Sequence, residues 1–237
     1  MVYSTNKTLF ENRYDAGRKL AEKLTEYQGR PVLVLAIPNG GMPIGLEVAL
    51  ALEAELDIII SRKIPIPLRP ESGFGAVTDD GTVILNQQVV DRLGLTQEQV
   101  NQQISDVTAN IRKRMLLYRG NRTLTLIPGK TVILVDDGLA SGYTMLAAIE
   151  SVRRRRPRQI IVAVPAASGN AVLEVERVCD KVITYVTSST PEFYIADYYQ
   201  SWHDLTDDEA LKCLREAQVR KFRANLPSAN PGTQGER

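Results

Sequence analysis

Residues 132–144 read VILVDDGLASGYT, and this stretch decides the fold. Its four leading apolar residues are typical of a strand that is buried on both faces of a parallel sheet. Asp136 and Asp137 follow, and a run of small residues then leads into a helical pattern at 145–152. The stretch therefore predicts a strand, a polar loop at its carboxyl end and a helix, which is the place where ligands bind in open α/β sheets.

The same alternation runs along the rest of the chain. Short apolar runs predict strands at 32–38, 56–60, 132–135 and 160–164, with weaker candidates at 82–85 and 182–187. Helical stripes lie between them, the longest from Val100 to Met115, and Thr96 with Gln99 predicts a capping box at its start. Strands that alternate with helices predict an α/β fold, a parallel sheet flanked by helices with right-handed crossovers.

Two segments depart from this alternation. Residues 64–81 are rich in Pro and Gly and lie between two predicted strands, so we predict a flexible lid loop there. Residues 223–237 have little apolar content, and we predict a disordered tail. The remaining residues, 1–222, predict one domain with a core at about 30–187.

Composition narrows the classes of function. The 237 residues include 29 basic and 28 acidic side chains, so net charge favours neither nucleic acid nor a membrane as partner. The only cysteines, Cys179 and Cys213, lie far apart and outside any His/Cys cluster, which argues against a disulfide framework and a structural zinc site. Since no apolar run approaches the ~18 residues of a membrane span, we expect a soluble cytoplasmic protein.

The loop after the central strand combines two kinds of chemistry. The N-terminus of a helix that follows small residues attracts anions, and Ser141, Gly142 and Thr144 add hydroxyl donors and close backbone approach. Paired carboxylates instead suit vicinal hydroxyls or hydrated Mg²⁺. A ligand that carries a phosphate beside a diol, such as a ribose 5-phosphate, matches both the helix start and the paired carboxylates.

VILVDDGLASGYT resembles the phosphoribosyl pyrophosphate (PRPP) binding motif of the type I phosphoribosyltransferases, and it departs at Gly138, where the family usually has an apolar residue. The resemblance implies that Asp136 and Asp137 hold the ribose hydroxyls and also Mg²⁺, directly or through water. The residues that it implies for the 5-phosphate are Ala140, Ser141, Gly142, Tyr143 and Thr144.

A second motif supports the resemblance. PNGGMPIG at 38–45 follows a predicted strand, and in the family this turn takes pyrophosphate, often through a non-proline cis peptide. The corresponding residues are Asn39, Gly40 and Gly41, and Asn39 stands where close relatives have an arginine, which removes one cation. Arg62 and Lys63, directly after the predicted strand 56–60, would supply charge to the leaving pyrophosphate.

From FENRYDAGRKLAEKL to SWHDLTDDEALKCL, the chain resembles a group of bacterial and archaeal phosphoribosyltransferases. The resemblance implies a Mg²⁺-dependent enzyme of nucleotide metabolism, which transfers the 5-phosphoribosyl group of PRPP to a small nitrogenous acceptor and releases pyrophosphate. It also implies a homodimer and a hood over the base, built from the N-terminal segment and residues 188–222, in which Phe193 or Tyr194 stacks on the base.

The resemblance also limits the acceptor. Ala140 stands where hypoxanthine- and guanine-type members carry an aspartate near the purine N7, so we predict that 6-oxopurines are poor acceptors. Glu71, within the predicted lid, is a candidate for handling a proton of the base.

Other functions are less consistent with the sequence. In a P-loop ending at Gly129-Lys130-Thr131, the first glycine would fall at Leu124. A serine hydrolase lacks both G-x-S-x-G and a clear partner for His203, the single histidine. The run 153–156 predicts a solvated helix end rather than an RNA site. A PRPP-binding regulator without turnover stays open because of Asn39.

Overall fold

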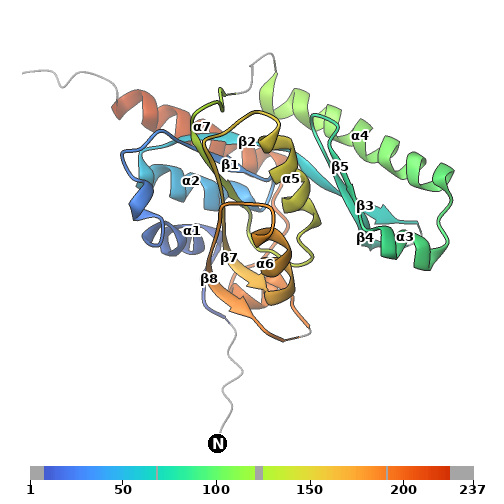
Figure 1. Ribbon diagram of the computed structural model, residues 1–237. Coiled ribbons are helices and arrows are strands. Elements are labelled where there is room, and N and C mark those ends of the chain that lie inside the picture. The colour runs from blue at the N-terminus through green and yellow to red at the C-terminus, as the bar shows by residue number, and fades with distance from the viewer. Residues whose placement is uncertain (1–7, 68, 121–124, 191, 225–237) are drawn as a thin grey trace, which may run out of the picture.

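The computed structural model describes residues 8–67, 69–120, 125–190 and 192–224, and Figure 1 shows their arrangement. The predicted tail beyond 224 and the side chain of Glu71 lie outside the described part. The elements are α1 (Arg13–Glu22), η1 (Thr25–Tyr27), β1 (Val32–Ala36), α2 (Gly41–Leu52), β2 (Glu55–Ile58), β3 (Ser61–Ile66), β4 (Arg69–Thr78), β5 (Val83–Leu85), α3 (Gln87–Leu93), α4 (Gln97–Arg119), β6 (Thr131–Val135), α5 (Tyr143–Arg153), β7 (Gln159–Ser168), α6 (Gly169–Glu176), β8 (Lys181–Ser188), η2 (Ile195–Tyr198) and α7 (Asp207–Ala224).

Five strands form a parallel sheet in the order β2-β1-β6-β7-β8, which confirms the predicted α/β fold. Helices α1 and α2 lie on one side of this sheet in Figure 1, and α5 and α6 lie on the other. The predicted capping box at Thr96 and Gln99 is present at the start of α4.

Each face of the sheet has its own core, because successive side chains of a strand point to opposite faces. In β6, Ile133 and Val135 belong to the core that contains the side chains of α1 and α2. Val132 and Leu134 belong to the core that contains Met145 and other side chains of α5. Strands buried on both faces explain the continuous apolar runs of the sequence.

The prediction that residues 64–81 form a loop without regular structure is wrong for most of that segment. Strands β3, β4 and β5 form a separate antiparallel sheet, and β3 pairs with β4 from Ser61↔Thr78 onward. Pro65 lies at a register shift, where a strand can accommodate proline. At Gly75 an added Cβ would lie 2.4 Å from the carbonyl oxygen of Ile84, so the strands approach too closely for a side chain. Proline and glycine thus shape a hairpin here.

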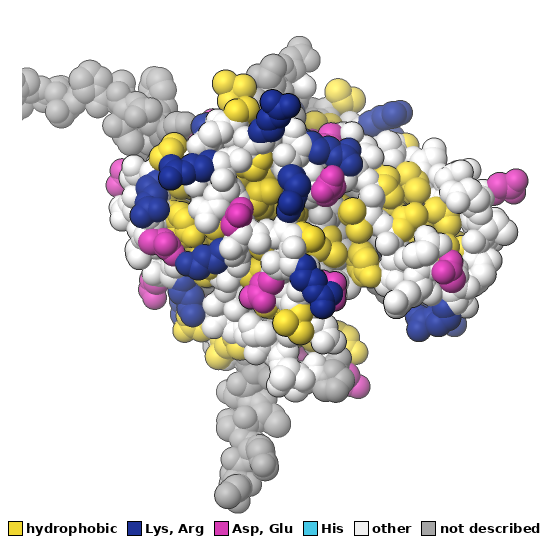
Figure 2. Space-filling view, in the orientation of Figure 1, with side chains coloured by type: hydrophobic (Ala, Val, Ile, Leu, Met, Phe, Trp, Pro, Cys, Tyr) yellow, Lys and Arg dark blue, Asp and Glu magenta, His cyan; other side chains and the backbone are white. Residues whose placement is uncertain are grey.

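The surface is mixed in charge. Figure 2 shows Lys and Arg interspersed with Asp and Glu over the parallel-sheet body, while hydrophobic side chains gather over the three-stranded sheet. Within the residues that the structure describes, no helix has the length and apolarity needed to cross a membrane.

The hairpin gives a testable prediction. Without ligand, the amides that pair β3 with β4 at 61–64 and 75–78 should exchange with solvent slowly, because they are bonded and backed by the buried ring of Phe74. The exposed first-turn amides of Gln97 and Glu98 serve as a fast reference. Exchange at 61–64 as fast as at this reference would contradict the structure.

Candidate functional site

Two loops meet at the carboxyl ends of the neighbouring strands β1 and β6. One is the turn 37–41 and the other begins at Asp136. A Cβ added at Gly40 would lie 2.0 Å from Oδ2 of Asp137, and one added at Gly41 would lie 2.8 Å from the carbonyl oxygen of Val135. Glycine at both positions therefore allows the turn to lie directly against the paired aspartates. The peptide between Pro38 and Asn39 is cis, as predicted for this turn.

The small-residue loop ends at the start of a helix. Gly142 has a φ of 82°, a left-handed conformation that favours glycine, and α5 begins at the next residue. Ala140 and Ser141 are exposed, and no side chain caps the start of α5, so its first backbone N–H groups have no partner within the helix. At Gly138 an added Cβ would lie 2.7 Å from Ile195, so η2 supplies the apolar side chain that the motif lacks at this position.

The two aspartates have different surroundings. Asp137 is 9% exposed, and both Nε and Nη2 of Arg13 lie 2.8 Å from its Oδ2. Asp136 is partly exposed, and its Oδ1 accepts a hydrogen bond from the backbone N–H of Asp137 at 2.8 Å. Desolvation of the Asp136 carboxyl raises its pKa well above its usual value, and the adjacent carboxylate raises this pKa further. Hydrogen-bond donors or a cation brought by a ligand would favour the ionised form of Asp136.

The aspartates are compatible with one mode of Mg²⁺ binding. Among the described residues, no three His, Cys, Asp or Glu side chains gather into a cluster that could hold a metal alone. Mg²⁺ is often held by one or two carboxylates together with waters and substrate phosphates, and Asp136 fits this mode.

The side chain of Asn39 is fully bonded to two distant helices. Its Nδ2 donates to the carbonyl of Leu205 at 2.7 Å and to Oδ1 of Asp207 at 3.0 Å. Its Oδ1 accepts from Nη1 of Arg114 at 2.7 Å and from the hydroxyl of Tyr118 at 2.9 Å. Asn39 therefore ties the glycine turn to α4 and to the start of α7.

Cations nevertheless stand near this turn. Nη1 of Arg114 lies 3.0 Å from Oδ1 of Asp207, and its guanidinium repels that of Arg62. Burial, followed by this repulsion, lowers the pKa of Arg62. Lys63 follows Arg62 on the same strand, so it points to the opposite face, where it covers Gly73 of β4. The structure thus separates the two cations that the sequence suggested would act together.

A hollow of about 560 Å³ adjoins the small-residue loop. Ala140 and Ser141 line one side, Asn170 at the start of α6 lines another, and Thr190 and Phe193 close it. The ring of Phe193 packs on Tyr198, with centroids 5.4 Å apart, which fixes its place. Tyr194 is 63% exposed and does not line this hollow. Of the two predicted hood residues, only Phe193 lies beside the site.

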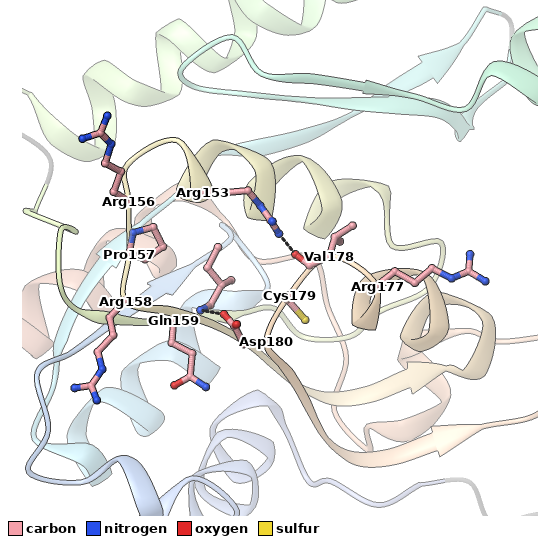
Figure 3. Close-up of a pocket in the computed structure, with 10 residues that line it drawn as sticks. Arg153, Arg156, Pro157, Arg158, Gln159, Arg177, Val178, Cys179 and Asp180 are labelled. Atoms are coloured by element: carbon pink, nitrogen blue, oxygen red, sulfur yellow. Dashed lines mark hydrogen bonds between the residues drawn. The ribbon is translucent and has the colours of Figure 1, made fainter.

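The basic run at the end of α5 does not form a convergent anion site. Figure 3 shows Arg156, Arg158 and Arg177 pointing in different directions around a shallow pocket. Arg153 turns inward and donates a hydrogen bond to the carbonyl of Val178. The prediction of a solvated helix end holds for the exposed Arg154 and Arg156, whereas Arg155 is paired with Asp80 and only 18% exposed.

Residues 78–201, just over half of the chain, match the family model described as "Phosphoribosyl transferase domain". The chain belongs to the phosphoribosyltransferase family. Together with the five-stranded parallel sheet, this membership confirms the resemblance drawn from the two motifs and the type I phosphoribosyltransferase fold.

Individual relatives agree with this membership. The chain is 32% identical over 209 residues to proteins of two Mycobacterium tuberculosis strains, named "Putative phosphoribosyl transferase MT0597" and "Putative phosphoribosyl transferase Rv0571c". Each alignment covers 88% of this chain and 47% of the relative, so the chain spans about half the length of these proteins. TT1426 from Thermus thermophilus has a similar structure, with a TM-score of 0.72 and 32% identity over 88% of this chain and 99% of that one.

The sequence analysis did not identify several residues of this candidate site. Arg13 and Arg114 reach the two loops from helices that are far away in the chain, and Asp207 does so from the start of α7. Each lies on an amphipathic helix whose charged residues look alike in sequence, so periodicity alone does not distinguish them. The segment FENRYDAGRKLAEKL, which contains Arg13, entered only through the resemblance.

The bonds of Asn39 predict a large effect of its removal. Asn39→Ala should lower the free energy of unfolding by about 1–3 kcal/mol, because buried polar partners lose their hydrogen bonds. Asn101→Ala, at an exposed position of α4, should change it by less than about 0.5 kcal/mol. Urea unfolding of both variants measures the difference, and equal stabilities would show that the network around Asn39 contributes little.

Proposed function

We propose that the protein is a Mg²⁺-dependent enzyme that transfers the 5-phosphoribosyl group of PRPP to a small nitrogenous acceptor and releases pyrophosphate. The observation that carries the proposal is the meeting of three features at one place. A helix start with exposed small residues, a partly exposed carboxylate and a glycine turn match the 5-phosphate, the ribose diol and the pyrophosphate of one ligand. No group of the ligand is left without a complementary partner.

The first two parts of PRPP have clear partners in this proposal. The 5-phosphate binds the backbone N–H groups and hydroxyls of 140–144, where the dipole of α5 favours an anion. The ribose diol faces the paired aspartates in this proposal, since an ionised carboxylate accepts but does not donate hydrogen bonds. Asp136 is partly exposed and can receive the ribose hydroxyls.

The leaving pyrophosphate needs positive charge and N–H donors. The turn 39–41 offers backbone groups, and Arg62 together with Arg114 adds guanidinium charge beside it. Mg²⁺, when bound, would supply further charge stabilisation to the departing oxygens, and Asp136 is the residue that would help hold it. The chain's own residues thereby favour cleavage of the bond to pyrophosphate.

These cations also bear on the alternative of a regulator that binds PRPP without turnover. That alternative rested on Asn39, which lacks the charge of an arginine. Arg114 contacts Asn39 directly, so a guanidinium is present beside the turn although it comes from another helix. We therefore favour an enzyme over a binding protein.

The hollow beside Ala140 is the proposed acceptor site. Its serine, threonine and asparagine side chains offer neutral hydrogen-bonding groups, and Phe193 offers an aromatic surface for a heterocycle. Glu174 adds one carboxylate to the lining, and this carboxylate is paired with Arg177. Ala140 leaves the loop without a carboxylate at the position where 6-oxopurine enzymes carry one. A base that needs no carboxylate from position 140 therefore suits this site better than hypoxanthine or guanine.

A first prediction concerns PRPP itself. The double variant Asp136→Asn/Asp137→Asn should bind PRPP and Mg²⁺ more weakly by about 1–3 kcal/mol, because it loses charge-assisted hydrogen bonds. Calorimetry with the double variant Asp91→Asn/Asp106→Asn, which removes two exposed carboxylates of α3 and α4, controls for net charge. Unchanged affinity in the first variant refutes the assignment.

A second prediction concerns the acceptor. With PRPP and Mg²⁺, pyrophosphate release should be slow with hypoxanthine, guanine or xanthine and faster with another base or amine of the panel, such as adenine or uracil. A sensitive pyrophosphate assay across the panel measures this order. Rapid turnover of hypoxanthine or guanine would show that another group replaces the missing carboxylate at 140.

A further inference from the structure

Arg13 joins the loop after β6 to the segment around His203, at the centre of the candidate site. Nε and Nη2 of Arg13 both lie 2.8 Å from Oδ2 of Asp137, and Nη1 donates to the carbonyl of His203 at 2.9 Å. Arg13 is 6% exposed, so all three of its nitrogens are used in a place from which water is largely excluded. A substrate has little access to this guanidinium.

Aromatic rings enclose the pair. The guanidinium carbon of Arg13 lies 3.8 Å from the ring centroid of Trp202, within the range of a strong cation–π contact. The hydroxyl of Tyr199 donates to the backbone carbonyl of Asp137 at 2.6 Å. Segment 198–203 also bonds to the backbone of Phe10 and Glu11, so both ends of the chain reach the aspartate as one layer.

The same carboxylate touches the glycine turn. Oδ2 of Asp137 occupies the space in which a Cβ of Gly40 would lie, so a shift of this oxygen moves the turn or collides with it. Asp137 also opens the loop that leads to α5. Its side chain therefore sets the spacing between the proposed pyrophosphate turn and the proposed phosphate loop.

We propose that Arg13 is a positioning residue that holds Asp137 as a structural anchor, and that Asp136 alone of the pair contacts the ribose. This inference rests on the proposed function, because it assigns different roles to two residues of the proposed PRPP site. Asp136 is partly exposed and its Oδ1 accepts a backbone N–H, whereas Asp137 is nearly buried, accepts the Nε–H of Arg13 and forms an ion pair with Nη2 of the same guanidinium.

The test is a double-mutant cycle in which calorimetry measures the binding of PRPP in the presence of Mg²⁺. Arg13→Gln and Asp137→Asn should each weaken binding about tenfold or more, because each leaves one buried charge without its partner. Arg13→Gln/Asp137→Asn has no charge left unpaired, and it should bind within about threefold of the wild type. Arg18→Gln, an exposed position of α1, is the matched control and should bind as the wild type.

Two outcomes overturn the inference. If the double variant binds as weakly as Asp137→Asn, the carboxylate of Asp137 contacts the ligand itself. If Arg13→Gln binds as the wild type, Arg13 does not position the site. Asp136→Asn should weaken binding in every background, and its failure to do so would also count against the division of roles.

Two further measurements separate folding from positioning. Trp202 is the only tryptophan, so its fluorescence emission reports on its contact with the guanidinium of Arg13. PRPP should change this emission in the wild type and in Arg13→Lys, which keeps the charge, but not in Arg13→Gln. An equal change in Arg13→Gln contradicts coupling through Arg13.

If the wild type binds no PRPP, the proposed function fails, and the anchor is judged from thermal unfolding alone. The double variant should then be more stable than the summed losses of the single variants imply. Additive losses would show that Arg13 and Asp137 are not coupled. If a single variant does not fold while the double variant does, the coupling is supported, and a double variant that fails to fold overturns it.

Discussion

The geometry of the site depends on one buried ion pair, in which Arg13 binds Asp137. A buried carboxylate without a partner is costly, and so is a buried guanidinium, so each fixes the other. Through this pair, α1 and the segment around Trp202 lie against the loops that end β1 and β6. Two segments that lie far apart in the sequence, α1 and the residues around Trp202, are thereby held against the same edge of the sheet.

A second network fixes the other side of the turn. Asn39 uses its amide to bind α4 and the segment at the start of α7. Positive charge stands beside the turn on Arg114, which Asn39 helps to hold. The turn therefore has a guanidinium next to it and attachments to two distant helices.

The sequence predicted the sheet and the two loops because both are local. A strand buried on both faces has a continuous apolar run, and the loop after it has a distinctive composition, as in VILVDDGLASGYT. The hairpin at 61–78 was mistaken for a loop because Pro65 and Gly75 serve a bulge and a close strand approach, which composition does not distinguish from a turn. The partners of Asp137 and Asn39 were missed because they are contacts over long sequence distances between ordinary helical residues.

The most direct measurement is a crystal structure of the protein with PRPP and Mg²⁺. The account predicts that the 5-phosphate lies on the N–H groups of 140–144, that the ribose hydroxyls contact Asp136, and that Arg13 remains bound to Asp137. A ribose held by Asp137 with the Arg13 pair broken, or a phosphate bound away from the start of α5, would contradict it.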